Sequence, residues 1–177
     1  MLELLKKRRS IRRYKADPVE AGKIEELVKA LLLSPSSRNI RPWEFIVVTD
    51  NQLLEQLSRS KEHHAVFLKG APLGIVVLAD QTKSDVWVED TSIASIIVQL
   101  AAESMGLGSC WIQIRNRMHD SNQTAEDYIK NLLHIPANYK VESIIALGYP
   151  DETRPPHDEN KLQYEKVFTD RYGEGYK

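Results

Sequence analysis

A single cysteine, Cys110, is present among the 177 residues, so no internal disulfide can form. This fits a reducing cytoplasm, where we expect the protein to be located. The sequence also lacks any apolar run that approaches the roughly 20 residues a membrane-spanning helix needs. Near the N-terminus, Leu4 and Leu5 are followed at once by Lys6 and Lys7, which is not the pattern of a secretory signal peptide.

An excess of either charge is missing as well, because 24 Lys and Arg residues oppose 25 Asp and Glu residues and the formal net charge is −1. We therefore expect neither nucleic acid nor a membrane as a partner. Hydrophobic residues make up 42% of the sequence and charged residues 28%, as in an ordinary globular protein. The length suits one domain over residues 1–177 with a sizeable core.

Several signatures of nucleotide binding, metal binding and hydrolysis are absent from the sequence. The segment Gly106-Leu107-Gly108 lacks the third glycine of a dinucleotide-binding loop, and it follows a predicted helix rather than a strand. His63 and His64 are adjacent, so they point to different sides of any regular element, and no third ligand is near them in the sequence. We therefore expect no metal site and name no side chain as a catalytic acid or base.

Hydrophobic periodicity predicts that helices and strands alternate. Strands are expected at 43–48, 74–79 and 141–148 and, after a turn, within 106–114; helices are expected at 2–9, 17–34, 50–58, 85–105 and 122–132. The continuously apolar strand 74–79 predicts a sheet covered on both faces. The helix 85–105 is apolar around much of its circumference, which is typical of a central helix or of one that faces a partner subunit.

The predicted helix at 17–34 has the clearest start signal. Asp17 is expected to cap it, Pro18 occupies the first turn, where a missing N–H costs nothing, and Glu20 is placed to close a capping box. The helix is expected to end at Ser34-Pro35, because the residue before a proline avoids helical angles.

Basic residues are concentrated in one stretch, Arg8-Arg9-Ser10-Ile11-Arg12-Arg13-Tyr14. Arginine keeps its charge at any working pH and offers a planar fork of donors that matches a phosphate. One interpretation is a solvated run of charge. A localised anion such as one phosphate fits better than nucleic acid, because no second basic stripe or set of stacking aromatics follows.

A polar loop, Ser34-Pro35-Ser36-Ser37-Arg38-Asn39-Ile40-Arg41-Pro42-Trp43, provides hydroxyl and amide groups that can line a pocket. Two later segments, Gly106-Leu107-Gly108-Ser109-Cys110-Trp111 and Leu147-Gly148-Tyr149-Pro150, each combine a turn with a strand. Together with the basic stretch, these segments resemble the nitroreductase family of FMN-dependent oxidoreductases, which reduce nitroaromatics and quinones with a nicotinamide donor. The resemblance follows the family's order and spacing and covers nearly the whole chain.

The resemblance implies an α+β fold with a mixed, mostly antiparallel central sheet that is flanked by helices in three layers. It also implies an intertwined homodimer with two FMN sites at the interface. Residues 151–177, which carry few apolar anchors, would then form a tail that wraps the partner subunit.

The resemblance further assigns residues to the FMN site by position. The phosphate, the ribityl chain and the pyrimidine edge are held at positions that correspond to Arg8, Arg9, Ser10 and Arg12. The loop that reaches the flavin from the other subunit corresponds to Ser36, Ser37 and Asn39. The main chain that passes the reactive side of the ring corresponds to Trp111, Ile112 and Gln113, and a basic position near the phosphate corresponds to Lys161.

Two residues depart from the family pattern. Arg41 stands where many members carry glutamine, which bears on the pocket wall and on substrate preference. Glu159 stands where many members carry a basic residue, two positions before Lys161. We therefore expect the phosphate to depend more on the N-terminal arginines.

The function implied by the resemblance is transfer of a hydride from NADH or NADPH through FMN to a nitroaromatic, quinone or related small-molecule acceptor, by a ping-pong mechanism. A flavin carries such chemistry itself, so no catalytic side chain is required. Reductive dehalogenation or processing of the flavin on the same fold is an alternative. Non-catalytic binding of a phosphorylated ligand is another.

Overall fold

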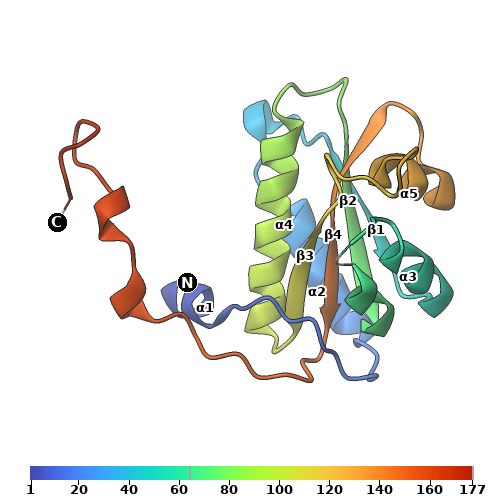
Figure 1. The fold of residues 1–177 in the computed structure, drawn as a ribbon, viewed down its shortest axis with the longest axis horizontal. Coiled ribbons are helices and arrows are strands. Elements are labelled where there is room, and N and C mark those ends of the chain that lie inside the picture. Colours follow the sequence, from blue (N-terminus) through green and yellow to red (C-terminus); the bar gives the residue numbers. More distant parts are fainter. Residues whose placement is uncertain (64, 177) are drawn as a thin grey trace.

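The computed structural model describes residues 1–63 and 65–176. Its helices are α1 (Leu2–Lys7), α2 (Ala21–Leu32), α3 (Asn51–Ser58), α4 (Trp87–Ser104) and α5 (Ala125–Leu133). Its strands are β1 (Trp43–Val48), β2 (Leu73–Asp80), β3 (Gly108–Gln113) and β4 (Tyr139–Gly148). Short 3₁₀ turns are η1 (Ser37–Asn39), η2 (Val66–Gly70), η3 (Glu159–Lys161) and η4 (Tyr164–Lys166). The predicted alternation of helices and strands is confirmed (Figure 1).

The four strands form one sheet in the order β1-β2-β4-β3, and each neighbouring pair is antiparallel. Among the described residues, parallel pairing is limited to one bridge, between Ser10 and Ser109. β2 and β4 lie in the middle of the sheet, and every residue of β2 is buried. β3 is an edge strand, so its outer side is open to further pairing.

Helices cover both faces of the sheet, as the apolar strands predict (Figure 1). Successive residues of a strand point to opposite faces. Ile75 accordingly packs with α2 and α4, whereas Val76 packs with α3 and α5. The expected three-layer α+β architecture is therefore correct.

The predicted start of α2 is wrong. The helix begins at Ala21, and its cap residue, Glu20, has an extended main chain (φ −63°, ψ 143°) and makes no capping bond. Its carboxylate instead accepts hydrogen bonds of 2.7 and 2.6 Å from the Tyr149 hydroxyl. Upstream, the Lys15 amide donates to the Tyr149 carbonyl at 2.9 Å. These long-range bonds keep the chain extended where the local signal at Asp17 predicts a helix.

The helices expected at 50–58 and 122–132 are present, and each begins with a side-chain cap. Asp50 Oδ1 accepts from the Leu53 amide at 2.8 Å at the start of α3. Thr124 Oγ1 accepts from the Asp127 amide at 3.0 Å at the start of α5. These two signals succeed because nothing distant competes for the capping oxygen.

α4 leaves apolar side chains in solvent. Ile93 and Ile96 are each 38% exposed, and Ile97 and Leu100 are partly exposed on the same stripe. In the part of the chain that the structure describes, no helix is long and apolar enough to cross a membrane.

The two ends of the chain run together along the lower edge of the domain in Figure 1. The Asp151 amide donates to the Arg13 carbonyl at 2.9 Å, and the His157 amide donates to the Lys6 carbonyl at the same distance. Beyond Leu162 the tail extends away from the sheet, with Tyr172 94% exposed.

Candidate functional site

The predicted phosphate-binding stretch is attached to the open edge of β3. The Ile11 amide donates to the Ser109 carbonyl at 3.0 Å, next to the parallel bridge between Ser10 and Ser109. This approach is close, because a Cβ added to Gly108 would lie 2.8 Å from Cβ of Ile11. A side chain at position 108 would therefore push the basic stretch off the sheet.

The arginine side chains gather around the start of β3. Arg8 and Arg9 are partly buried, while Arg12 is exposed, with its guanidinium carbon 5.8 Å from the centre of the Phe67 ring. Burial raises the pKa of the Cys110 thiol, and the positive charges of Arg12 and Arg8 act in the opposite direction. Cys110 is thus a core residue whose thiol feels the charge of two of the predicted arginines.

Glu152, near the other end of the chain, is hydrogen-bonded to the main chain of the basic stretch. Its Oε1 accepts from the amides of Arg12 (2.6 Å) and Arg13 (3.2 Å), and its Oε2 lies 2.8 Å from Arg154 Nη2. These contacts hold the pKa of Glu152 below its ordinary value, with the Arg12 amide as the largest cause. With the main chain fixed in this way, the Arg12 guanidinium remains free of Glu152.

The edge of β3 presents main-chain groups beside this cluster. The Ile114 amide donates to the Glu142 carbonyl of β4 at 3.1 Å. Because amides alternate in direction along a strand, those of Trp111 and Gln113 point away from β4, as does the Ser109 carbonyl that pairs with Ile11. The Ile112 side chain is buried in the core, and by the same alternation its amide and carbonyl point toward its partner Ile144 on β4, so this residue offers no group at the open edge.

The predicted loop contacts from the other subunit lie around η1. The Ser37 amide donates to Asp90 Oδ1 at 2.8 Å, and the Ser36 hydroxyl accepts from the Arg41 amide at 2.8 Å. Three residues other than glycine have positive φ here: Arg38 (52°), Asn39 (56°) and Arg41 (53°). Such angles are costly, so the surrounding bonds hold the loop in an uncommon shape.

Arg41, which departs from the family pattern, has a defined role in this loop. Its Nε donates to Asn39 Oδ1 at 2.9 Å, so it orients the amide that the sequence assigns to the flavin. On the outer side of the loop, Arg38 forms an ion pair with Asp85. Both charged residues therefore support the loop, and the Arg41 contact fixes the direction of Asn39.

The structure does not bring the two predicted groups together in one chain. Ser37 is bonded to Asp90 in the first turn of α4, whereas Arg9 and Ile11 share a surface groove with Glu103 in its last turn. About 20 Å of helix axis separates Asp90 from Glu103. Figure 1 shows η1 and the N-terminal stretch at opposite ends of α4. Each chain thus carries the two predicted groups at opposite ends of α4.

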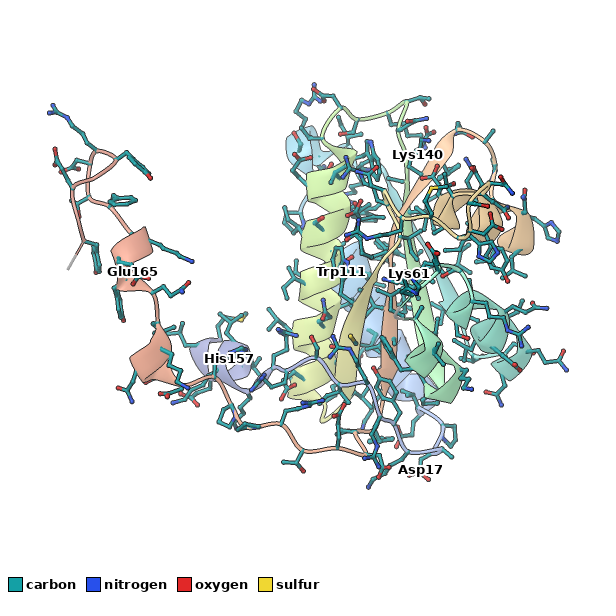
Figure 2. The ribbon with its side chains drawn as sticks, in the orientation of Figure 1. Asp17, Lys61, Trp111, Lys140, His157 and Glu165 are labelled. Atoms are coloured by element: carbon teal, nitrogen blue, oxygen red, sulfur yellow. The ribbon has the colours of Figure 1, made fainter. Side chains whose placement is uncertain are left out.

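Lys161 lies in η3, on the tail beside α1, and is exposed. The tail is held there by an ion pair of 3.0 Å between Lys6 and Glu159, and Arg9 donates to the Pro155 carbonyl. Figure 2 labels His157, which lies next to α1 in agreement with its bond to Lys6. The departure at Glu159 is therefore matched by a lysine within the same chain.

Sequence reasoning missed two residues that anchor the predicted segments. Asp90 and Glu152 anchor the two segments, but their partners are 53 and 140 residues away in the sequence, so no local pattern marks them. Burial lowers the pKa of Lys61, a partly buried lysine that the sequence analysis did not single out. Lys61 and Trp111 are both labelled in Figure 2. The sequence marks Lys61 only as a lysine that stands between two apolar segments.

The remaining candidates form no site. Among the described residues, no group of three His, Cys, Asp or Glu side chains is placed to hold a metal ion. His63 is exposed, and His64 lies outside the described residues.

Comparison with known proteins identifies the family. The model of the "Nitroreductase family" matches residues 5–63 and 54–149. An FMN-dependent nitroreductase from Clostridium difficile R20291 has a solved structure that is similar at a TM-score of 0.96, with 50% identity over 97% of this chain and 100% of that chain. A solved structure from Parabacteroides distasonis, provisionally named an NADH dehydrogenase/NAD(P)H nitroreductase, has a TM-score of 0.88 and 35% identity over 97% and 98% of the two chains.

A curated protein from Methanothermobacter thermautotrophicus carries the same provisional name. It is 36% identical over 172 residues, which are 94% of this chain and 87% of that protein. The family model spans more than half of the chain, and these relatives cover nearly all of it. The chain belongs to the nitroreductase family.

Proposed function

We propose that this protein is an FMN-dependent NAD(P)H oxidoreductase whose two flavin sites are each built from two chains. The observation that carries the proposal is the pair of half-sites at opposite ends of α4. The similar protein from Clostridium difficile is an FMN-dependent nitroreductase, and the relative from Methanothermobacter thermautotrophicus is provisionally named for NAD(P)H.

The donor set of the basic stretch fits the phosphate end of FMN. Arg8, Arg9 and Arg12 offer guanidinium groups, which pair bidentately with phosphate oxygens, and Ser10 adds a hydroxyl. The cluster is held by Ile11 and Glu152 through main-chain bonds, so the Arg12 side chain remains available to a ligand. Lys161 adds a further positive charge on the neighbouring tail.

The edge of β3 fits the redox end. FMN supplies hydride transfer when it is bound, and the protein supplies binding, orientation and electrostatics. The outward amides of Trp111 and Gln113 are donors fixed by the sheet, so they stabilise negative charge that develops beside the strand without reorganisation. The arginines at the start of the same strand add positive charge.

A second copy of the chain would complete each site and cover the exposed apolar residues. The stripe of Ile93, Ile96, Ile97 and Leu100 follows the first turn of α4, where Asp90 anchors Ser37. The tail carries further exposed apolar side chains, Leu162, Val167 and Phe168. We assign these surfaces to the homodimer, with the tail wrapping the partner.

The first test is the colour and reactivity of the purified protein. We expect a yellow protein whose flavin is bleached by NADH or NADPH and recovers on addition of a nitroaromatic or a quinone. A protein that remains colourless after reconstitution with FMN would contradict the proposal. Turnover of a halotyrosine with nitro compounds and quinones inert would instead favour reductive dehalogenation.

The role of the tail is tested by two truncations. Removal of residues 163–177 keeps the contacts of Glu152 and Glu159, whereas removal of 151–177 also deletes Lys161. We expect the short truncation to weaken the dimer and the long one to lower FMN affinity as well. FMN binds the assembled state, so it should stabilise both truncated proteins less than the full chain in thermal melts. Equal stabilisation in all three would show that the tail does not wrap the partner.

A further inference from the structure

One buried carboxyl group near the proposed flavin edge has no part in the contacts described above. Glu142 lies in the middle strand β4 and is 4% exposed. On β2, Val77 pairs with Ser143 and the next residue, Leu78, pairs with Val141. Glu142 is therefore the additional residue of a β-bulge. Bulges re-aim a side chain, and they are frequent beside functional sites.

The Glu142 side chain is linked to the outer face of β3. Its Oε1 accepts from Gln113 Nε2 at 3.4 Å, and Gln113 Oε1 accepts from Trp111 Nε1 at 2.9 Å. Gln113 Nε2 also donates to the Arg115 carbonyl at 3.1 Å. The Glu142 carbonyl accepts from the amides of Ile114 and Arg115, both at 3.1 Å. Glu142 thus holds the end of β3 through its main chain and its side chain.

The other carboxyl oxygen is poorly compensated. Glu142 Oε2 is buried and has no hydrogen-bond partner among the residues that the structure describes. Arg115 Nε is 4.0 Å away, too far for a hydrogen bond, and the Arg115 guanidinium also lies over the Trp87 ring at 5.9 Å. A buried charge that is not fully paired destabilises the folded state, so packing alone does not account for a carboxyl group at this position.

We propose that Glu142 is a positioning residue that acts through Gln113 to fix the Trp111 indole and the outward amides at the end of β3. The proposal rests on the FMN site proposed above. It explains why a carboxyl group is kept in the core and why the bulge turns it toward Gln113. It also explains why Gln113 bonds inward, which leaves its main-chain amide as the group that it presents at the edge of the sheet.

Ionisation of Glu142 should change this arrangement. A carboxylate accepts a stronger hydrogen bond from the Gln113 amide than a neutral carboxyl does. Burial raises the pKa of Glu142, and the nearby charge of Glu89 on α4 adds to the rise, while the Gln113 bond and the Arg115 guanidinium oppose it. Gln113 and Trp111 should therefore respond to pH above the ordinary glutamate value of about 4.3.

The test follows the indole N–H resonance of Trp111 in the full-length, ¹⁵N-labelled protein between pH 4 and pH 8, assigned with Trp111→Phe. We expect one titration of this resonance, with its midpoint above the ordinary glutamate value, and its loss in Glu142→Gln. Glu44→Gln removes a carboxylate on β1 and should leave the titration unchanged. A titration that persists in Glu142→Gln, or that is absent from the unsubstituted protein, would overturn the proposal.

A second variant keeps the proposal testable if Glu142→Gln does not fold. Gln113→Ala breaks the link at a partly exposed residue, and it should also abolish the Trp111 titration. In protein loaded with FMN, a plot of the flavin midpoint potential against pH should change slope at the same pH as the Trp111 titration. This break in slope should be lost in both variants. A break that remains in the variants would contradict a positioning role. If the unsubstituted protein binds no FMN, the proposed function fails while the resonance still reports on Glu142.

Discussion

The main-chain amide of Ser37 donates a 2.8 Å hydrogen bond to Oδ1 of Asp90, which is 2% exposed in the first turn of α4. This bond places the predicted cross-subunit loop at the end of α4 that is remote from the arginine cluster. In the proposed site, the arginines of one chain and the loop of a second chain hold the same flavin.

Arg12→Ala should weaken FMN binding while leaving the fold intact, because the guanidinium is exposed and its main chain is fixed by Glu152. A hydrogen bond to a charged group contributes roughly 1.5–3 kcal/mol, so the dissociation constant should rise about tenfold to a hundredfold. Arg13→Ala is the matched control, since Arg13 lies on the same stretch and pairs with Asp151 in solvent. Equal dissociation constants for Arg12→Ala and the unsubstituted protein would show that the motif is misplaced.

Asp90→Ala should loosen the loop that carries Ser36, Ser37 and Asn39. The Ser37 amide would lose a charged acceptor, and the strained angles of the loop would lose their anchor, at a cost of about 1–3 kcal/mol. We expect FMN affinity to fall on the order of tenfold in fluorescence titrations. Asp85→Ala breaks only the exposed pair with Arg38 and should change affinity little. A similar loss in both variants would count against Asp90 as the anchor.

Gly108→Ala should separate the basic stretch from β3. The added Cβ would lie 2.8 Å from Cβ of Ile11, which has no flexible end to move aside. We expect a loss of roughly 1–3 kcal/mol in the free energy of unfolding, together with weaker FMN retention. Gly22→Ala in α2 meets nothing within 4 Å and should leave stability unchanged or raise it by up to about 1 kcal/mol. If both variants have the same free energy of unfolding in chemical denaturation, the close approach of Ile11 to Gly108 does not contribute to stability.

The hydrogen bonds to Glu152 should make the free energy of unfolding depend on pH. Hydrogen bonds from the Arg12 and Arg13 amides lower the pKa of Glu152 in the folded state. The stabilisation is therefore present above the pKa of the unfolded chain and is lost as the pH falls through the lower, folded value. Glu152→Gln should melt at a lower temperature at pH 7, and the difference should shrink as the pH falls below the ordinary glutamate value of about 4.3. A difference in melting temperature that is independent of pH would exclude this contribution.

The strands and most of the helices could be predicted because their signals are local. An apolar run such as that of β2 fixes burial on both faces, and Asp50 and Thr124 cap helices that begin within three residues of them. The start of α2 could not be predicted, because Tyr149 takes the Glu20 carboxylate from the other end of the sequence. The hydrogen bond from the Arg12 amide to Glu152 is likewise long-range, since 140 residues separate the two. The bulge at Glu142 depends on the pairing of β4 with β2, which is also distant in the sequence.

The resemblance predicts the site as a set of residues, and it does not predict how these residues are arranged within one chain. The motifs name Arg12 and Asn39 together, and only the fold reveals that α4 holds them apart in one chain. Arg41 illustrates the same limit. Its departure from the family pattern is visible in the sequence, but its bond to Asn39 depends on a loop with three positive φ angles. Because none of these three residues is a glycine, the sequence does not indicate the angles.

The most direct test of a site shared between two chains combines Arg12→Ala with Asp90→Ala. These substitutions damage opposite half-sites, so a heterodimer of the two variants has one site with both defects and one site with none. Heterodimers can be isolated with two different affinity tags, and their FMN content can be measured after gel filtration. We predict that each variant alone retains little FMN and that the heterodimer regains one tightly bound FMN. Heterodimers that hold no more FMN than their parents would contradict a flavin site built from two chains.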